Sequence, residues 1–208
     1  NPLMFIFCAP AGAGKSTICR ELLQRDSSLM LSVSTTTRPP RPGEKDGVHY
    51  FFVTEREFEL RVQDGRFLEH ARFGGARYGT ELKNIESAKS QGADLLFDID
   101  VQGAESLKKS FPDQVAVVFV FPSSLEVLLQ RLRARGTDSE ERIAERMRIA
   151  RRELEVLLGK DFSDYLLLND ELERAVIKAS TIISAERMRM CHIERETLLG
   201  IFPPPKMP

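Results

Sequence analysis

The sequence predicts an α/β protein built on a doubly wound parallel sheet. Short, continuously apolar runs alternate along the chain with longer segments of helical period. Continuous rather than alternating hydrophobicity is typical of parallel strands, because helices cover both of their faces. The regular alternation of strand and helix favours a sheet whose strands are joined by helical crossovers. A chain of 208 residues is long enough for one such core with inserted lobes.

Four apolar runs are expected to be strands buried on both faces, at 3–8, 95–99, 115–121 and 165–168. Helical period is found between and after them, at about 15–25, 102–109, 123–135, 139–158 and 171–193. These elements assign residues 1–33, 91–130 and 159–195 to the core. The Pro-rich residues 196–208 are expected to form a loose tail, because proline cannot continue a helix.

Two stretches interrupt the alternation of strand and helix. Residues 34–90 open with a segment rich in Pro and Gly, which suits neither a helix nor a central strand. Strand-like pieces follow at 49–53, 66–73 and 76–80. We interpret this stretch as a small β-rich lobe inserted into the core, and the charged helical region 131–158 as a second insertion.

Composition excludes several classes of protein. The formal net charge of −1 argues against gripping nucleic acid by bulk charge. The three cysteines show no CxxC spacing, which indicates neither a disulfide framework nor a zinc site and fits a reducing compartment. No apolar run approaches the roughly 20 residues of a membrane span, and no signal-peptide pattern is seen at the N-terminus. We therefore expect a cytoplasmic protein without membrane or nucleic-acid partners, and leave a homo-oligomer open.

The first strand runs into a loop of small residues that ends in a lysine and two hydroxyls. Residues 9–16 have the length of the phosphate-binding loop GxxxxGK[ST], with Ala9 in place of the first glycine. Small side chains let consecutive backbone N–H groups wrap a phosphate, and the following helix adds its positive N-terminal end. Lys15 can reach the terminal phosphates, and the Ser16 hydroxyl can bind Mg²⁺. The alternative is an ordinary strand-to-helix turn, which Gly-x-Gly-Lys-Ser-Thr between strand and helix disfavours.

A second element supports a nucleotide site. Asp98 ends a buried apolar strand, where a carboxylate can meet a metal ion bound to phosphates. Together with the loop it predicts ATP and Mg²⁺, with Ser16 and Asp98 as metal ligands. The residues expected to hold ATP are Ala9, Pro10, Ala11, Gly12, Ala13, Gly14, Lys15, Ser16, Thr17 and, past a core strand, Asn169. Asn169 is equally read as an ordinary helix cap.

The Pro-stiffened loop at the start of residues 34–90 indicates a second substrate. It carries Arg38 and Arg41, with Tyr50 nearby. Guanidinium groups present paired donors that match phosphate oxygens, so the loop suits a terminal phosphate. A solvated basic loop is the alternative.

Residues 36–53 resemble the signature of guanylate kinases. The matching residues are Thr36, Thr37, Arg38, Arg41, Glu44, Gly47, Tyr50, Phe52 and Val53. The likeness continues through "FLEHARFGGARYGT", "LLFDIDVQGA", "RLRARGTDSEERIAERM" and "LLLND", and covers residues 3 to about 195. The Ala-Pro opening of the phosphate loop is similar to bacterial members.

The resemblance implies transfer of the γ-phosphoryl group of ATP to GMP, and also to dGMP, in purine nucleotide metabolism and GMP recycling. By that match the GMP site is lined by Ser34, Arg38, Arg41, Tyr50, Glu69, Tyr78, Thr80 and Asp100. The chemistry agrees, since the carboxylate of Glu69 can accept from guanine N1–H and N2–H₂ while hydroxyls donate to O6. Adenine would leave that carboxylate unpaired, which is costly in a buried site.

The resemblance also assigns the catalytic cations, Lys15, Arg38, Arg131, Arg135 and Arg146. It makes 131–158 a lid that closes over both nucleotides and excludes water. Pairing of Glu with Arg on a solvated helix would explain much of the same charge pattern.

Three other functions compete with this interpretation. A guanylate kinase-like module that binds protein segments would not need Lys15, Asp98 and the lid arginines. Another nucleoside monophosphate kinase is disfavoured by Glu69, whose carboxylate suits guanine. A phosphate-loop NTPase that uses water leaves the pair Arg38 and Arg41 unexplained.

Overall fold

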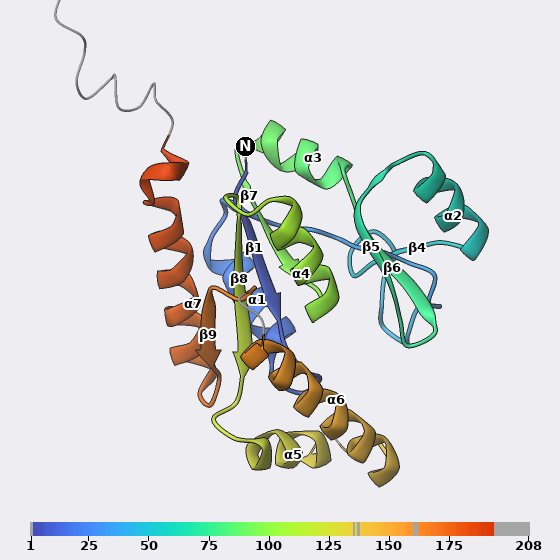
Figure 1. The fold of residues 1–208 in the computed structure, drawn as a ribbon, viewed down its shortest axis with the longest axis vertical. Helices are drawn as coiled ribbons and strands as arrows, with labels where there is room; N and C mark the ends of the chain where they lie inside the picture. The colour runs from blue at the N-terminus through green and yellow to red at the C-terminus, as the bar shows by residue number, and fades with distance from the viewer. Residues whose placement is uncertain (1, 135, 137, 160–161, 194–208) are drawn as a thin grey trace, which may run out of the picture.

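The protein is described by a computed structural model that covers residues 2–134, 136, 138–159 and 162–193. Its main sheet has five parallel strands in the order β2-β7-β1-β8-β9 (Figure 1). The strands are β1 (Met4–Cys8), β2 (Leu29–Leu31), β7 (Asp94–Asp98), β8 (Val115–Phe121) and β9 (Tyr165–Leu168). The predicted parallel α/β core is confirmed, and the strand order places β1 and its phosphate loop at the centre.

Helices cover both faces of this sheet, as a doubly wound fold requires. One face packs on α1 (Lys15–Arg25) and α7 (Leu172–Arg187), through residues such as Ile18 and Val176. The other packs on α3 (Lys83–Gln91), α4 (Val101–Ser110), α5 (Leu125–Ala134) and α6 (Glu140–Gly159). Side chains of β1 alternate between the two cores, with Phe5 on one side and Ile6 on the other.

The expectation that 165–168 is buried on both faces is wrong. β9 is an edge strand, and only Leu167 of its leucines is buried, while Leu166 and Leu168 are exposed. An apolar run cannot distinguish an edge strand from a central one, because the periodicity records side-chain type and not the neighbours.

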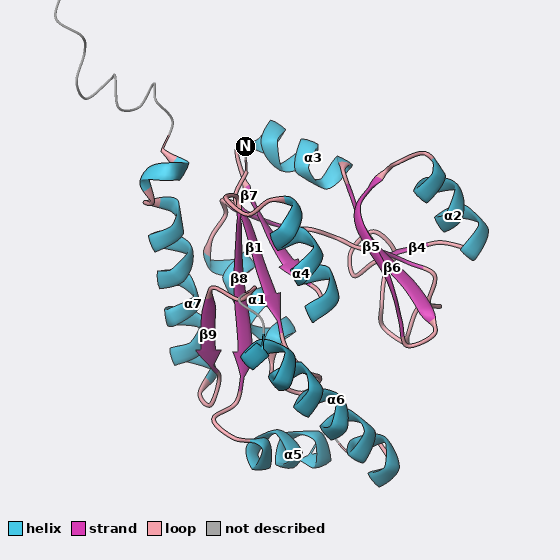
Figure 2. Ribbon diagram, viewed as in Figure 1, coloured by secondary structure: helices cyan, strands magenta, loops and turns pink. Residues whose placement is uncertain are grey.

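Residues 35–81 form a second sheet, in the order β4-β3-β6-β5 (Figure 2). Its strands are β3 (Thr35–Thr36), β4 (Phe51–Phe52), β5 (Phe67–Phe73) and β6 (Ala76–Glu81). The hairpin of β5 and β6 matches the predicted pieces 66–73 and 76–80, and β4 lies within 49–53. This sheet stands beside the core, connected to it through the chain before β3 and through α3.

Two helices and two strands were not predicted from the sequence: α2 (Glu55–Gln63), α3, β2 and β3. The expectation that the Pro- and Gly-rich segment suits no central strand is wrong at its start, where β3 is an inner strand of the small sheet. The start of α2 was readable, since Thr54 and Glu57 form a reciprocal capping box. Its periodicity is weak because only Phe58 is buried. The short β2 pairs with β7 and has a single fully buried residue, Leu29.

The last helix is shorter than expected. α7 ends at Arg187, and a 3₁₀ turn follows at Met190–His192, whereas helix was predicted to 193. Arg187 forms ion pairs of 2.8 Å with Asp94 of β7 and with Asp26 at the end of α1, which tie this end of α7 to both elements. The predicted tail at 196–208 lies outside the described residues. In the described part of the chain, no helix is long and apolar enough to cross a membrane.

Phe58 is the anchor of α2 on the small sheet. Its ring is fully buried, stacks on Phe67 at 4.5 Å between centroids, and lies under the Arg77 guanidinium. Phe58→Ala is expected to lower the free energy of unfolding by about 3–5 kcal/mol, the usual cost of an aromatic cavity. Denaturant unfolding measures it. Leu60→Ala on the exposed side of the same helix should change it by less than about 0.5 kcal/mol; equal losses would contradict this packing.

Candidate active site

The loop between β1 and α1 is shaped to expose backbone donors. Gly12 and Gly14 have φ of 92° and 91°, a region that only glycine adopts readily. None of the described residues accepts a hydrogen bond from the N–H groups of Gly12, Gly14, Lys15 or Ser16. These donors surround the positive end of α1, which makes the loop an anion cradle.

Asn169, which follows the edge strand β9, supports this loop. Its side-chain amide donates to the Ala13 carbonyl at 2.7 Å, and both residues are buried. A Cβ added to Gly14 would lie 2.3 Å from the same amide nitrogen. Gly14 is therefore required both by its φ and by the closeness of Asn169. Asn169 therefore contacts the loop backbone and does not cap α7, whose N-cap is Glu171.

Lys15 lies where the loop meets the end of β7. Its ammonium is 2.8 Å from an Asp98 oxygen and donates to the Ile99 carbonyl at 2.6 Å. Burial lowers the pKa of Lys15, but the Asp98 carboxylate outweighs it and leaves that pKa above its ordinary value. The lysine is charged and oriented before any ligand arrives.

The small sheet contributes an aromatic and cationic wall. The rings of Tyr50 and Tyr78 meet edge to face at 6.0 Å, and the Arg38 guanidinium lies 5.4 Å from the Tyr50 ring centre. One Arg38 nitrogen is 2.9 Å from both oxygens of Glu44. Glu44 also accepts from the Arg41 backbone N–H at 2.7 Å. Burial raises the pKa of Glu44, but these bonds more than offset it and hold that pKa below its ordinary value.

Glu69 on β5 forms the opposite end of this wall. One of its oxygens accepts from the Thr80 hydroxyl at 2.8 Å, while burial raises the pKa of the carboxyl above its ordinary value. Its other oxygen lies 3.5 Å from where a Gly103 Cβ would be, an ordinary van der Waals contact distance. Asp100 caps α4 by accepting from the Gly103 N–H at 2.9 Å.

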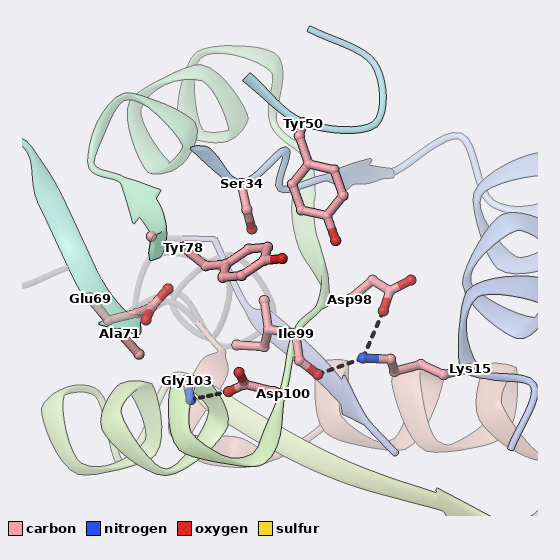
Figure 3. Close-up of a pocket in the computed structure, with 11 residues that line it drawn as sticks. Lys15, Ser34, Tyr50, Glu69, Ala71, Tyr78, Asp98, Ile99, Asp100 and Gly103 are labelled. Carbon is pink, nitrogen blue, oxygen red and sulfur yellow. Dashed lines mark hydrogen bonds and ion pairs between the residues drawn. The ribbon is translucent and has the colours of Figure 1, made fainter. Parts of the chain in front are cut away.

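These groups enclose one pocket of about 190 Å³ between the core and the small sheet. Its lining residues are Lys15, Ser34, Tyr50, Glu69, Ala71, Tyr78, Gly79, Asp98, Ile99, Asp100 and Gly103. Figure 3 shows Lys15 and Asp98 at one end and Glu69 at the other, with the two tyrosine hydroxyls directed into the space between. The pocket thus joins a phosphate cradle to the half-buried carboxylate of Glu69.

Comparison with known proteins identifies the family. The family model described as guanylate kinase matches residues 2–186. The chain belongs to the guanylate kinase family. It is 47% identical over 191 residues to a guanylate kinase of Idiomarina loihiensis, an alignment covering 91% of this chain and 89% of that one. It is 46% identical over 196 residues to one from Syntrophotalea carbinolica, covering 94% and 91%.

A solved structure agrees. The crystal structure of guanylate kinase from Anaplasma phagocytophilum matches with a TM-score of 0.77 and 31% identity, covering 97% of this chain and 96% of that one.

Most residues expected from the guanylate kinase resemblance lie at this pocket. Seven line it directly: Lys15, Ser34, Tyr50, Glu69, Tyr78, Asp98 and Asp100. Thr80 contacts it through Glu69, and Arg38 through Tyr50. Arg41 does not line it, and its side chain is exposed.

The lid arginines also lie away from the pocket in this structure. Arg131 donates to the Asp170 carbonyl at 3.1 Å, and Arg146 pairs with Asp138 at 3.4 Å. Arg135 lies outside the described residues. Both described guanidinium groups are therefore engaged by the protein itself and would have to exchange partners to reach a nucleotide.

The groups expected to hold Mg²⁺ are an exposed hydroxyl, Ser16, and the carboxylate of Asp98. Among the described residues, no cluster of three His, Cys, Asp or Glu side chains could hold a metal ion by itself. Ser16 and Asp98 are both oxygen donors, the ligand type that Mg²⁺ takes together with waters and nucleotide phosphates.

Sequence reasoning missed Glu153. It lies on α6 and, with Asp100, lines a second cavity of about 340 Å³ between α4 and α6. Burial raises its pKa to about 7, with Lys15 opposing the shift and Asp100 adding to it. In the sequence Glu153 is one of many acidic residues among the arginines of α6, and no periodic signal distinguishes it.

The raised pKa of Glu153 makes stability depend on pH. The unfolded value is 4.5, so the cost of burying the charge is absent below pH 4.5 and complete above about pH 7. Glu153→Gln should therefore leave unfolding free energy unchanged near pH 4.5 and raise it by about 2–3 kcal/mol at pH 8. Denaturant unfolding across this range measures it. Glu155→Gln, on the exposed side of α6, is the control; a pH-independent effect of Glu153→Gln would contradict the shift.

Proposed function

We propose that this chain transfers the γ-phosphoryl group of ATP to GMP, giving ADP and GDP. The observation that carries the proposal is a single pocket with Lys15 and the phosphate loop at one end and half-buried Glu69 at the other. Guanylate kinases with 40–47% identity over at least 90% of this chain support the same activity.

The donor end suits the phosphates of ATP. Residues 9–17 offer uncommitted N–H groups and the positive end of α1, and Asn169 keeps the loop in shape. In this structure the Asp98 carboxylate pairs with the Lys15 ammonium. A phosphate would take over the lysine and release the carboxylate of Asp98, which with the Ser16 hydroxyl would hold Mg²⁺. When bound, the ion supplies charge neutralisation between the phosphates.

The acceptor end suits guanine. Glu69 is fixed by Thr80 through one oxygen, and its other oxygen faces the pocket side of Gly103. A carboxylate in this position can accept from N1–H and N2–H₂ of guanine, and the Ser34 hydroxyl can donate to O6. Asp100 contributes a further acceptor on the same side.

Between the two ends, transfer requires positioning and charge compensation rather than a base. The second pKa of a phosphate monoester is near 6, so at neutral pH most GMP is already the dianionic nucleophile. An oxygen of GMP attacks the γ-phosphorus while the bond to the bridging oxygen of ADP breaks. Lys15, Arg38 and the lid arginines Arg131, Arg135 and Arg146 would offset the repulsion. Arg41, Tyr50 and Tyr78 would hold the GMP phosphate.

This division of labour follows the chain. Residues 34–90 would bind GMP, residues 131–158 would act as the lid, and the remaining core would bind ATP. Closure of the lid would bring Arg131 and Arg146 from Asp170 and Asp138 to the phosphates. Exclusion of water on closure would suppress hydrolysis of ATP.

A guanylate kinase-like module that only binds protein segments is the second reading of the family. Such a module has no use for a charged, oriented Lys15 beside Asp98. The presence of Lys15 beside Asp98, together with Arg131 and Arg146 in the proposed lid, supports the enzyme over the binding module.

The substrate panel is the decisive assay. ADP release from ATP is followed with GMP, dGMP, AMP, UMP or dTMP as the acceptor. GMP should give the highest kcat/KM, with dGMP also accepted and AMP at least about 10³-fold poorer, because adenine leaves buried acceptors unpaired.

Lys15→Ala serves as the inactive control, and it should keep GMP binding because the guanine end is untouched. ADP release that does not depend on an acceptor would indicate a hydrolase. Absence of release with every acceptor would overturn the proposal.

Glu69 is expected to set the preference for guanine. Glu69→Gln replaces an acceptor oxygen by a donor NH₂ that faces the donors of guanine. The KM for GMP should rise about 10- to 100-fold, the cost of one to two lost charged hydrogen bonds, while AMP changes little. Steady-state kinetics with both nucleotides measure the ratio. Glu86→Gln removes an exposed carboxylate from α3 and is the matched control. An unchanged GMP-to-AMP ratio would remove Glu69 from base recognition.

A further inference from the structure

The cavity between α4 and α6 lies outside the nucleotide pocket and has no role in the function proposed above. The two spaces share only Asp100 among their lining residues. Its apolar lining comes from Val101, Ile149 and Val156. One wall thus belongs to the core and the other to the proposed lid, and α6 lies across the end of the sheet at which α4 begins (Figure 1).

An acceptor and a donor are left unpaired on the two walls. On α6, one oxygen of Glu153 is inaccessible to solvent and has no hydrogen-bond partner among the described residues. On α4, the exposed Gln102 amide likewise makes no hydrogen bond within the described part of the chain. A buried unpaired acceptor is costly, and a carboxylate oxygen more so than a neutral one.

The neighbouring charges do not supply the missing partner. Asp100 and Glu105 line the same cavity from the α4 side and repel a carboxylate. Arg152 precedes Glu153 directly, and adjacent residues on a helix do not face each other. Lys15 acts on Glu153 through its field but is committed to Asp98 and the Ile99 carbonyl. Gln102 is the neutral donor that the opposite wall offers.

We propose that Gln102 and Glu153 are positioning residues that form a latch between the core and the lid when the cavity closes. The Gln102 amide donates to the unpaired oxygen of Glu153, while Val101 packs against Ile149 and Val156. The inference rests on the proposed function, because closure of residues 131–158 belongs to phosphoryl transfer. The unsatisfied carboxylate disfavours the open arrangement, and the latch rewards the closed one.

Exchange of the two side chains tests the latch. Gln102→Met removes the donor at similar size, and Gln102→Glu places two carboxylates face to face. Each should lower kcat for GMP phosphorylation about tenfold or more, as the loss of a hydrogen bond to a charged group implies. The pair Gln102→Glu with Glu153→Gln re-forms the bond in reverse and should restore kcat to within about threefold. Gln102→Met with Glu153→Gln has no donor at 102 and should stay impaired.

Two further measurements separate positioning from folding. The nucleotide-free protein should unfold at the same temperature with Gln102→Met as without it, because Gln102 makes no hydrogen bond in the open arrangement. Addition of ADP and GMP together should slow amide hydrogen exchange in α6 of the unmodified chain, and less so in Gln102→Met. The matched controls are Ser106→Glu, which introduces a charge at an exposed position of α4, and Glu155→Gln, which removes one from an exposed position of α6.

Three outcomes would overturn the latch in a chain that does phosphorylate GMP: a kcat for Gln102→Met equal to that of the controls, no recovery in the exchanged pair, or a loss of stability in nucleotide-free Gln102→Met. Absence of GMP phosphorylation in the unmodified chain would instead count against the proposed function.

Discussion

The ion pair between Lys15 and Asp98 is the interaction on which the site depends. It joins the loop after β1 to the carboxyl end of β7. These two strands are far apart in the sequence but are parallel neighbours in the sheet, which has β1 at its centre. The carboxyl ends of parallel strands lie at the same edge of the sheet, so the phosphate loop and Asp98 meet there although they are far apart in the sequence. Without that pairing, Lys15 would be a buried ammonium with a single carbonyl partner, which is costly.

The same edge explains how two substrates share one pocket. The segment after β7 passes from Asp98, beside the lysine, to Asp100, which caps α4 and faces Glu69. A single residue, Ile99, thus separates the carboxylate at the phosphate end from the carboxylate at the base end. The small sheet closes the other side with Tyr50 and Tyr78, so neither the core nor the inserted sheet forms the pocket alone.

The core strands and the phosphate loop could be predicted from the sequence because their signals are local. Continuous apolar runs and a glycine-rich turn ending in Lys15 need no knowledge of partners. The pocket residues Glu69 and Tyr78, and Thr80 bonded to Glu69, came from family resemblance instead, since their spacing on a hairpin has no diagnostic pattern. The exposure of Leu166 and the burial of Glu153 were beyond reach, because each depends on which element lies opposite. Local sequence patterns depend on the type of each side chain, whereas exposure and burial depend on which element packs against it.

The bond from Asn169 to the Ala13 carbonyl spans 156 positions of the chain. The cradle therefore acquires its support from a residue just after β9, which is synthesised long after the loop itself. During translation the amino-terminal loop must wait, incompletely braced, until the segment after β9 has left the ribosome. A nascent chain halted before that point would carry every residue of the loop motif and still lack a rigid receptor for the nucleotide.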